Sequence, residues 1–262
     1  LSPFWWKETL RARAVTLVNS VGFRPHVIRK RIEGEDCAFF IGDPTGAAWY
    51  GRTLDHDNLE MRFVREHLLK PGMTVLEVGG HHGHDTIPLS RWAGEAGRVI
   101  TVEPLPENVA IIRENVRLND LRNVEIVAAA LGAESGAARL KRTSNGSIAT
   151  GDSGEPVDVL TVDDLCERRG VWPDLIKLDV EGFEVDVLLG AKKALARRPV
   201  LQVEIHPHAL PKFGRTAQDF WNALDLTGYE CWMQLNDLDV PQPAVVPAPT
   251  PNRCHLFARP KV

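Results

Sequence analysis

Short apolar runs that alternate with helical patterns constrain the fold of this chain more than any other feature. The apolar runs lie at residues 70–80, 98–104, 124–131, 174–182 and 200–207, and helical patterns occupy residues 59–69, 107–119 and about 185–196. Strands that alternate with helices in this way are typical of a parallel sheet with helices on both faces. We therefore predict one doubly wound α/β domain over residues 59–262.

The end of the chain departs from this alternation. Residues 229–235 and 254–260 read as two strands that are joined by a proline-rich stretch, with no helix between them. Strands connected without a crossover helix pair antiparallel. The prediction is a mostly parallel, Rossmann-like sheet of seven strands with an antiparallel pair at one edge.

Residues 1–58 lie outside the repeating pattern and are assigned to an N-terminal extension. Residues 3–20 predict an amphipathic helix with Trp5 and Trp6 near basic side chains, and residues 27–44 predict a hairpin with a Glu-Gly-Glu turn. Docking on its own domain or on a second subunit is favoured for the helix, which leaves a homo-oligomer open. Anchoring at a membrane surface is the alternative.

Composition excludes several classes of partner. The chain has 31 basic and 35 acidic side chains and a formal charge of -4, so no strong positive field favours nucleic acid. Its four cysteines form no CxxC pair, which disfavours a zinc knuckle and fits a reducing compartment. No apolar run reaches the ~20 residues of a transmembrane helix. We expect a cytoplasmic protein with a small-molecule substrate.

A glycine loop at residues 75–86 is the first candidate binding element. Gly79, Gly80 and Gly83 follow a buried strand and precede a helix, where backbone N–H groups are free to meet a ligand. The spacing is not that of GxGxxG, which counts against a dinucleotide. Glu103 ends the next strand, about 20 residues further on, where an acid binds both hydroxyls of a ribose. A nucleoside-bearing ligand follows, either NAD or S-adenosylmethionine, and the antiparallel final pair favours the latter.

Five sequence blocks in this region resemble the FkbM family of methyltransferases. They are LEVGGHHGHDT, RVITVEPLPENVAIIRENVRLN, NVEIVAAALG, DLIKLDVEGFEVDVLLGA and PVLQVEIHP, which together cover about residues 70–207. The resemblance implies a class I methyltransferase fold, S-adenosylmethionine as the methyl donor, and transfer to a hydroxyl oxygen, often of a sugar or a polyketide. It also implies positions for the cofactor: Glu77, Gly79, Gly80, His81 and Gly83 along the methionine part, Glu103 at the ribose, and Asp179 beside the methyl end.

The chain departs from the family pattern at two places in this loop. Glu77 stands where the family usually has Asp, and the loop reads GGHHGHD where an Ala-Asn pair and a hydrophobic residue are common. The histidines His81, His82 and His84 invite a metal hypothesis, but neighbours on a tight loop rarely converge on one ion. We expect them to fill the loop and shape the pocket.

Two pairs of polar residues end the later strands, where open α/β sheets bind their ligands. Asp179 and Glu181 follow one strand, and Glu204 and His206 follow the next. A hydroxyl that attacks a methyl group must lose its proton, which requires a base. His206 is the first candidate, unless it only binds backbone at the turn, and Asp179 is the second. Glu181 and Glu204 are expected to bind substrate or orient His206.

Several alternatives stay open at this point. The same four residues suit a divalent cation, although we expect a metal-independent reaction. Lys177 is expected to pair with a carboxylate, and the polar segment 141–154 reads as a lid or an exposed loop. The predicted function is O-methylation of a sugar, a polyketide or another secondary metabolite. A nicotinamide-dependent oxidoreductase and a non-catalytic adenosyl-ligand-binding protein are the competing functions.

Overall fold

The computed structural model describes residues 22–51, 58–141, 147–148 and 154–261, and the structural statements below concern these residues. The predicted helix at residues 3–20 lies outside them, as does most of the segment expected to form a lid. Within the described part, no helix combines the length and the apolar character needed to cross a bilayer.

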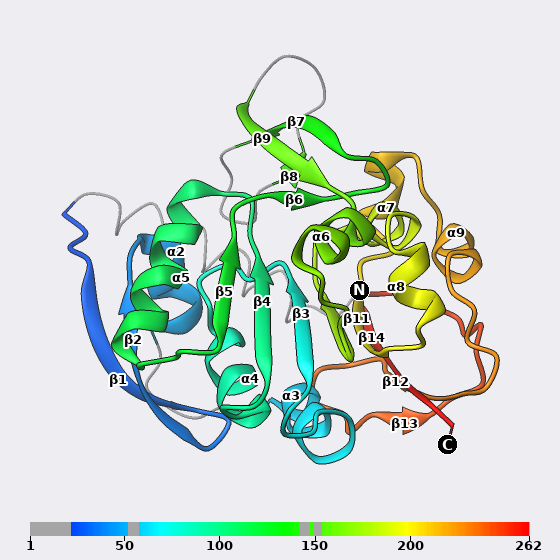
Figure 1. Cartoon of the computed structure of the whole chain (residues 1–262), viewed down its shortest axis with the longest axis horizontal. Coiled ribbons are helices and arrows are strands. Elements are labelled where there is room, and N and C mark those ends of the chain that lie inside the picture. Colours follow the sequence, from blue (N-terminus) through cyan, green and yellow to red (C-terminus); the bar gives the residue numbers. More distant parts are fainter. Residues whose placement is uncertain (1–21, 52–57, 142–146, 149–153, 262) are drawn as a thin grey trace.

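The main sheet has eight strands in the order β13-β12-β14-β11-β10-β3-β4-β5 (Figure 1). Five adjacent strands are parallel: β3 (Thr74–Val78), β4 (Arg98–Val102), β5 (Val124–Val127), β10 (Leu175–Leu178) and β11 (Val200–Ile205). β14 (Cys254–Pro260) lies between β11 and β12 (Tyr229–Gln234) and is antiparallel to both, and the two-residue β13 (Gln242–Pro243) adds to β12. The predicted sheet with its antiparallel edge is confirmed.

Alternating strand residues face opposite layers of helices, as the two-residue period of a strand requires. Leu76 belongs to a core with α6 (Val162–Arg169), α7 (Glu184–Leu189), α8 (Lys192–Ala196) and α9 (Ala217–Asn222). Val75 belongs to the opposite core with α3 (Leu59–Phe63), the π-helical turn η1 (Val64–Leu68) and α4 (Thr86–Ala93). α5 (Pro106–Leu118) contacts β5, and a 3₁₀ turn, η2 (Leu210–Phe213), precedes α9.

The helix expected at about 185–196 is two helices, because the chain breaks at Gly190. A Cβ on Gly190 would lie 2.1 Å from the carbonyl oxygen of Gly132, so only glycine permits this approach. The strand expected at 124–131 is also divided. β5 ends at Val127, and β6 (Ala130–Leu131) joins a second sheet with β9 (Glu155–Leu160), β7 (Gly136–Lys141) and β8 (Ser147–Ile148), which lies near the carboxyl ends of the parallel strands (Figure 1).

The N-terminal hairpin is confirmed. β1 (His26–Ile32) and β2 (Glu35–Ile41) pair antiparallel around Glu33 and Gly34, which both have positive φ, as a tight two-residue hairpin turn requires. The backbone N–H of Phe40 donates to Oδ1 of Asn115 at 2.6 Å, which fixes the hairpin on α5. The unpredicted helix α2 (Pro44–Tyr50) follows and is capped by the Asp43 side chain. It carries Trp49 and Tyr50 to the carboxyl end of the sheet.

Candidate active site

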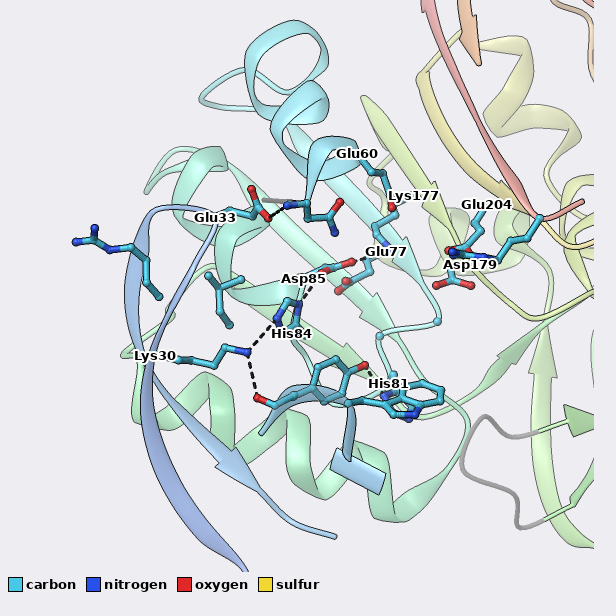
Figure 2. Close-up of a pocket in the computed structure, with 18 residues that line it drawn as sticks. Lys30, Glu33, Glu60, Glu77, His81, His84, Asp85, Lys177, Asp179 and Glu204 are labelled. Atoms are coloured by element: carbon cyan, nitrogen blue, oxygen red, sulfur yellow. Dashed lines mark hydrogen bonds and ion pairs between the residues drawn. The ribbon is translucent and has the colours of Figure 1, made fainter. Parts of the chain in front are cut away.

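Two adjoining cavities lie at the carboxyl ends of the parallel strands. The polar cavity, of about 350 Å³, is lined by Glu77, Asp85, Lys177 and Glu204 among others (Figure 2). The apolar cavity, of about 130 Å³, is lined by the residues Val78, Val102, Glu103, Leu131 and Phe183 among others. Trp49, Tyr50, Gly79, His81 and Asp179 line both cavities. The two cavities therefore share one wall, formed by the glycine loop, α2 and the end of β10.

The first two glycines of the loop are required by close contacts with neighbouring strands. Gly79 has φ +92°, and a Cβ there would lie 1.8 Å from the carbonyl oxygen of Asp179. A Cβ on Gly80 would lie 2.2 Å from Oγ1 of Thr101. Gly83 also has positive φ but packs near Ile112 and lines neither of these two cavities. The glycines thus bring the loop backbone to the seam between the cavities.

Glu103 lies at the end of β4 and is only 5% exposed. Its carboxylate accepts hydrogen bonds from the backbone N–H of His81 at 2.9 Å, from the N–H of Leu105 at 3.0 Å and from Nδ2 of Asn108 at 3.1 Å. Burial raises the pKa of Glu103 to about 7 in spite of these bonds. The side chain is thus held rigidly at the edge of the apolar cavity.

Glu77 is a buried carboxylate in the wall of the polar cavity. It is 1% exposed, and its Oε2 accepts a hydrogen bond from Oγ1 of Thr86 at 2.6 Å. Burial raises its pKa to about 7, and Lys177 acts in the opposite direction. A buried acid with a raised pKa favours a cationic ligand group, because such a group offsets the cost of ionising it.

Lys177 pairs with a carboxylate, as expected. Its Nζ lies 3.2 Å from Oδ2 of Asp85, at the end of the glycine loop. Burial acts to lower the pKa of Lys177, but Asp85 and Asp179 outweigh burial and hold it well above its usual value. Lys177 in turn holds the pKa of Asp85 below its usual range although burial opposes this. The pair is therefore charged on both sides.

Two of the loop histidines, His81 and His84, line the polar cavity, whereas His82 is fully buried and lines neither cavity. The rings of His81 and His82 stack with centroids 4.0 Å apart, and Nδ1 of His81 lies 2.8 Å from the Tyr50 hydroxyl. The ring of His84 stacks on the ring of Tyr50, with centroids 4.9 Å apart.

The helix α2, which carries Tyr50, was missed by sequence reasoning, although Asp43-Pro44 is a helix-start signal.

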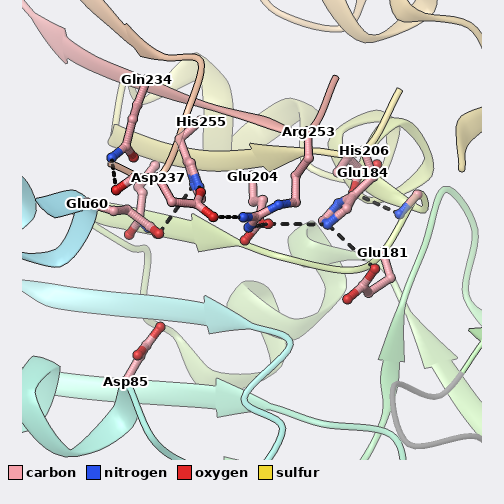
Figure 3. A network of polar contacts seen from close by, with 12 residues as sticks. Glu60, Asp85, Glu181, Glu184, Glu204, His206, Gln234, Asp237, Arg253 and His255 are labelled. Carbon is pink, nitrogen blue, oxygen red and sulfur yellow. Dashed lines mark hydrogen bonds and ion pairs between the residues drawn. The ribbon is translucent and has the colours of Figure 1, made fainter. Parts of the chain in front are cut away.

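His206 lies among three carboxylates and is 2% exposed (Figure 3). Its Nδ1 is 2.7 Å from Oε1 of Glu184, and its Nε2 is 3.4 Å from Glu204 and 3.5 Å from Glu181. Burial acts to lower the pKa of His206, but Glu184 and Glu204 outweigh burial and raise it to about 11. The ring therefore carries two protons at neutral pH, and its firm partner is the Glu184 side chain instead of turn backbone.

Asp179, Glu181 and His206 are brought together, with ligand-capable atoms within 4.8 Å of one another. Burial and the neighbouring Glu204 raise the pKa of Asp179 well above its usual value. The pKa of Glu204 is held well below its usual range although burial opposes this, because His206, His255 and Arg253 stabilise its charge. Sequence reasoning missed Glu184 and Arg253, which come from other elements. The only signal for Glu184 is its place at the start of the next helix.

Comparison with known proteins agrees with this geometry. The sequence model of one protein family, the methyltransferase FkbM domain, matches residues 77–231, which is more than half of the chain. The crystal structure of methyltransferase FkbM from Methylobacillus flagellatus KT superposes with a TM-score of 0.50 at 16% identity, covering 82% of this chain and 51% of that one. The chain thus spans about half the length of that protein.

Shorter local similarities extend to other methyltransferases. A protein-L-isoaspartate O-methyltransferase of Methanococcoides burtonii is 41% identical over 56 residues, which is 21% of this chain and 28% of the relative. An arsenite methyltransferase of Halobacterium salinarum is 39% identical over 64 residues, 24% of this chain and 16% of the relative. The family model, the fold and the glycine loop followed by Glu103 agree, and the chain belongs to the FkbM family of S-adenosylmethionine-dependent methyltransferases.

Proposed function

We propose that this chain transfers the methyl group of S-adenosylmethionine to a hydroxyl oxygen of a small molecule such as a sugar, a polyketide or another secondary metabolite. The observation that carries the proposal is the position of Asp179. Its carboxyl group lines both cavities and has a raised pKa. A base that lies beside the bound cofactor is what proton removal from an acceptor hydroxyl needs.

The residues that line the cavities fit this cofactor. Glu103, at the apolar cavity, suits the two hydroxyls of a ribose, and Glu77, at the polar cavity, suits an ammonium group. Gly79, Gly80 and His81 lie between them and leave the loop backbone accessible to the ligand. Gly83 contributes by turning the loop into α4. When bound, the cofactor supplies a methyl carbon that is already activated by its cationic sulfur.

Proton transfer is the step that the protein must assist. His206 holds a second proton at neutral pH, so it must first release that proton before it can act as a base. Burial and Glu204 shift the pKa of Asp179 upward, whereas Lys177 and His206 act in the opposite direction, so its ionised carboxylate is a stronger base than that of an ordinary aspartate. We assign the hydroxyl proton to Asp179. His206, Glu181 and Glu204 then orient the acceptor and balance charge.

The remaining features of the proposal rest on the sequence. A cytoplasmic location follows from the scattered cysteines, and the neutral to acidic charge favours a small-molecule partner over nucleic acid. Oligomerisation through the N-terminal helix belongs to the same proposal. Transfer without a metal ion is the simplest form of the reaction, because the base is provided by the protein.

Calorimetric titration with S-adenosylhomocysteine and, separately, with NADH tests this proposal. S-adenosylhomocysteine should bind with one equivalent per chain, and NADH should not compete with it, because the loop lacks the dinucleotide spacing. Binding of NADH alone would support an oxidoreductase, and binding of neither ligand would support loss of the cofactor site. Either result would overturn the proposed function.

A further inference from the structure

His255 has a buried ring nitrogen that no hydrogen bond satisfies. The side chain is 2% exposed, and its Nδ1 has no hydrogen-bond partner among the described residues. Leaving a buried polar atom unpaired costs ~1–3 kcal/mol, so such an atom is expected to have a ligand. His255 lies in β14, in register with Glu204 of the antiparallel strand β11. Residues paired in this way have their side chains on the same face of the sheet.

A third side chain completes a set of ligands around this nitrogen. Glu60, from α3, places Oε2 at 3.5 Å from Nδ1 of His255 (Figure 3). Gln202 donates a hydrogen bond to the other oxygen of Glu60, Oε1. The ligand-capable atoms of Glu60, Glu204 and His255 all lie within 4.8 Å of one another. Two carboxylates and one imidazole therefore converge from three separate elements.

The distance between Nδ1 of His255 and Oε2 of Glu60 suits an ion between them better than a direct hydrogen bond. A direct N–H···O bond is expected at about 2.9 Å, so 3.5 Å is too long. Two ligand atoms that each lie ~2.1 Å from one ion at the tetrahedral angle are ~3.4 Å apart. The separation of Nδ1 of His255 and Oε2 of Glu60 matches the second case.

The other ring nitrogen of His255 faces a carboxylate. Its Nε2 lies 3.6 Å from Oδ1 of Asp237, and Arg253 pairs with both Asp237 and Glu204. A ligating histidine commonly directs its second nitrogen to a carboxylate, which leaves the first nitrogen free for the metal. Asp237 therefore lies on the Nε2 side of the ring, and Nδ1 is the nitrogen on the side of Glu60.

The charge of the cluster also calls for a cation. Glu60, Glu204 and Asp237 face one guanidinium, that of Arg253. Burial acts to lower the pKa of His255, but Glu60 and Asp237 outweigh burial and raise it to about 8, so the cluster takes up further positive charge, either as a proton on His255 or as an ion that displaces this proton. One divalent ion supplies this charge.

Nearby cations are already engaged elsewhere. Lys177 pairs with Asp85, and His206 lies between Glu181 and Glu184 as well as Glu204. These groups therefore cannot replace an ion at His255.

We propose that Glu60, Glu204 and His255 bind one divalent transition-metal ion of the zinc type in the wall of the polar cavity. Glu60 and Glu204 line that cavity, so an ion can enter from it. The mixed nitrogen and oxygen ligands favour Zn²⁺ or Co²⁺ over Mg²⁺, which requires oxygen ligands in octahedral geometry. This inference does not depend on the proposed methyl transfer.

Metal binding to the full chain tests the site directly. The protein is stripped with EDTA, dialysed and titrated with ZnCl₂ by calorimetry, and CoCl₂ is added to a second sample for absorption spectroscopy. One equivalent of Zn²⁺ should bind, and Co²⁺ should give the intense visible band of a tetrahedral site. Mg²⁺ should bind far more weakly.

Four variants locate the ion. His255→Gln and Glu60→Gln should each weaken Zn²⁺ binding by about 10- to 100-fold or more, because even residues outside the ligand set have effects of this size. His67→Gln, a half-exposed histidine, controls for surface binding and should leave the affinity unchanged. His206→Gln tests the neighbouring group of Asp179, Glu181 and His206, and should also leave it nearly unchanged.

Three results would overturn the proposal. They are the absence of Zn²⁺ binding to the wild-type chain, unchanged binding in Glu60→Gln, and loss of binding in His206→Gln with normal binding in His255→Gln. Circular dichroism checks that each variant is folded. If His255→Gln does not fold, Glu60→Gln decides alone, because Glu60 is less deeply buried than His255.

Discussion

Replacement of Glu103 by Gln should separate the cofactor-binding role of this residue from its structural role. The carboxylate accepts hydrogen bonds from two backbone N–H groups, of His81 and Leu105, and from the amide of Asn108. Glu103→Ala would leave these three donors without their acceptor and would cost stability, at ~1–3 kcal/mol for each buried unsatisfied group. Gln keeps the size of the side chain and one acceptor oxygen for Leu105 and Asn108, so it leaves only the backbone N–H of His81 without an acceptor while it removes the charge.

The expected loss of affinity follows from the kind of bond that is removed. Hydrogen bonds to a charged group are worth ~1.5–3 kcal/mol and those to a neutral group ~0.5–1.5 kcal/mol, so the ribose contact should weaken by about 1–2 kcal/mol. This corresponds to roughly a 5- to 30-fold larger Kd, at about 1.4 kcal/mol for each factor of ten.

Calorimetric titration with S-adenosylhomocysteine measures this loss. Glu114→Gln is the matched control, because Glu114 lies on α5 and forms an i,i+3 surface pair with Arg117. Loss of this pair should leave the Kd unchanged. A Kd of Glu103→Gln within twofold of the wild-type value, in a protein with normal circular dichroism, would refute the ribose assignment.

Three further predictions follow from the geometry. Because burial raises the pKa of Glu77 to about 7, the unfolding free energy of the cofactor-free chain should fall as the pH rises from about 4.5 to 7, and Glu77→Gln should flatten this fall in denaturant titrations. Gly79→Ala should lower the unfolding free energy by more than about 2 kcal/mol, because its Cβ would meet the carbonyl oxygen of Asp179 at 1.8 Å, whereas Gly136→Ala, in open space, should change it little. Asp179→Asn should lower kcat by ~10²–10⁴-fold, while His206→Gln should retain the acidic limb of the pH–rate profile; a lost limb in His206→Gln would identify His206 as the base.

The strand ends were predictable from the sequence because parallel strands direct their carboxyl ends to one edge of the sheet. Glu103, Asp179, Glu204 and His206 each directly follow or end an apolar run, so their meeting place follows from the topology alone. The seven predicted strands are all present in the structure. Their alternation with helices leaves few other arrangements.

The protonation of His206 was not predictable, because it depends on distances between side chains from different elements. Glu184, its firm partner, begins the next helix and has no distinguishing spacing. The position of His255 beside Glu204 was not predictable for a different reason. It lies within the apolar run 254–260, and only the antiparallel register of β14 sets it beside Glu204. Contacts that depend on register cannot be read from one strand.

The position of the transferred methyl group tests the central proposal most directly. The chain is incubated with S-adenosylmethionine labelled with ¹³C in the methyl group and with hydroxyl-bearing acceptors, sugars and polyketides among them, and the products are analysed by NMR. We predict a methyl carbon bonded to oxygen, formed with release of S-adenosylhomocysteine and much reduced in Asp179→Asn. A label found on nitrogen or carbon, or full activity of folded Asp179→Asn, would contradict the account.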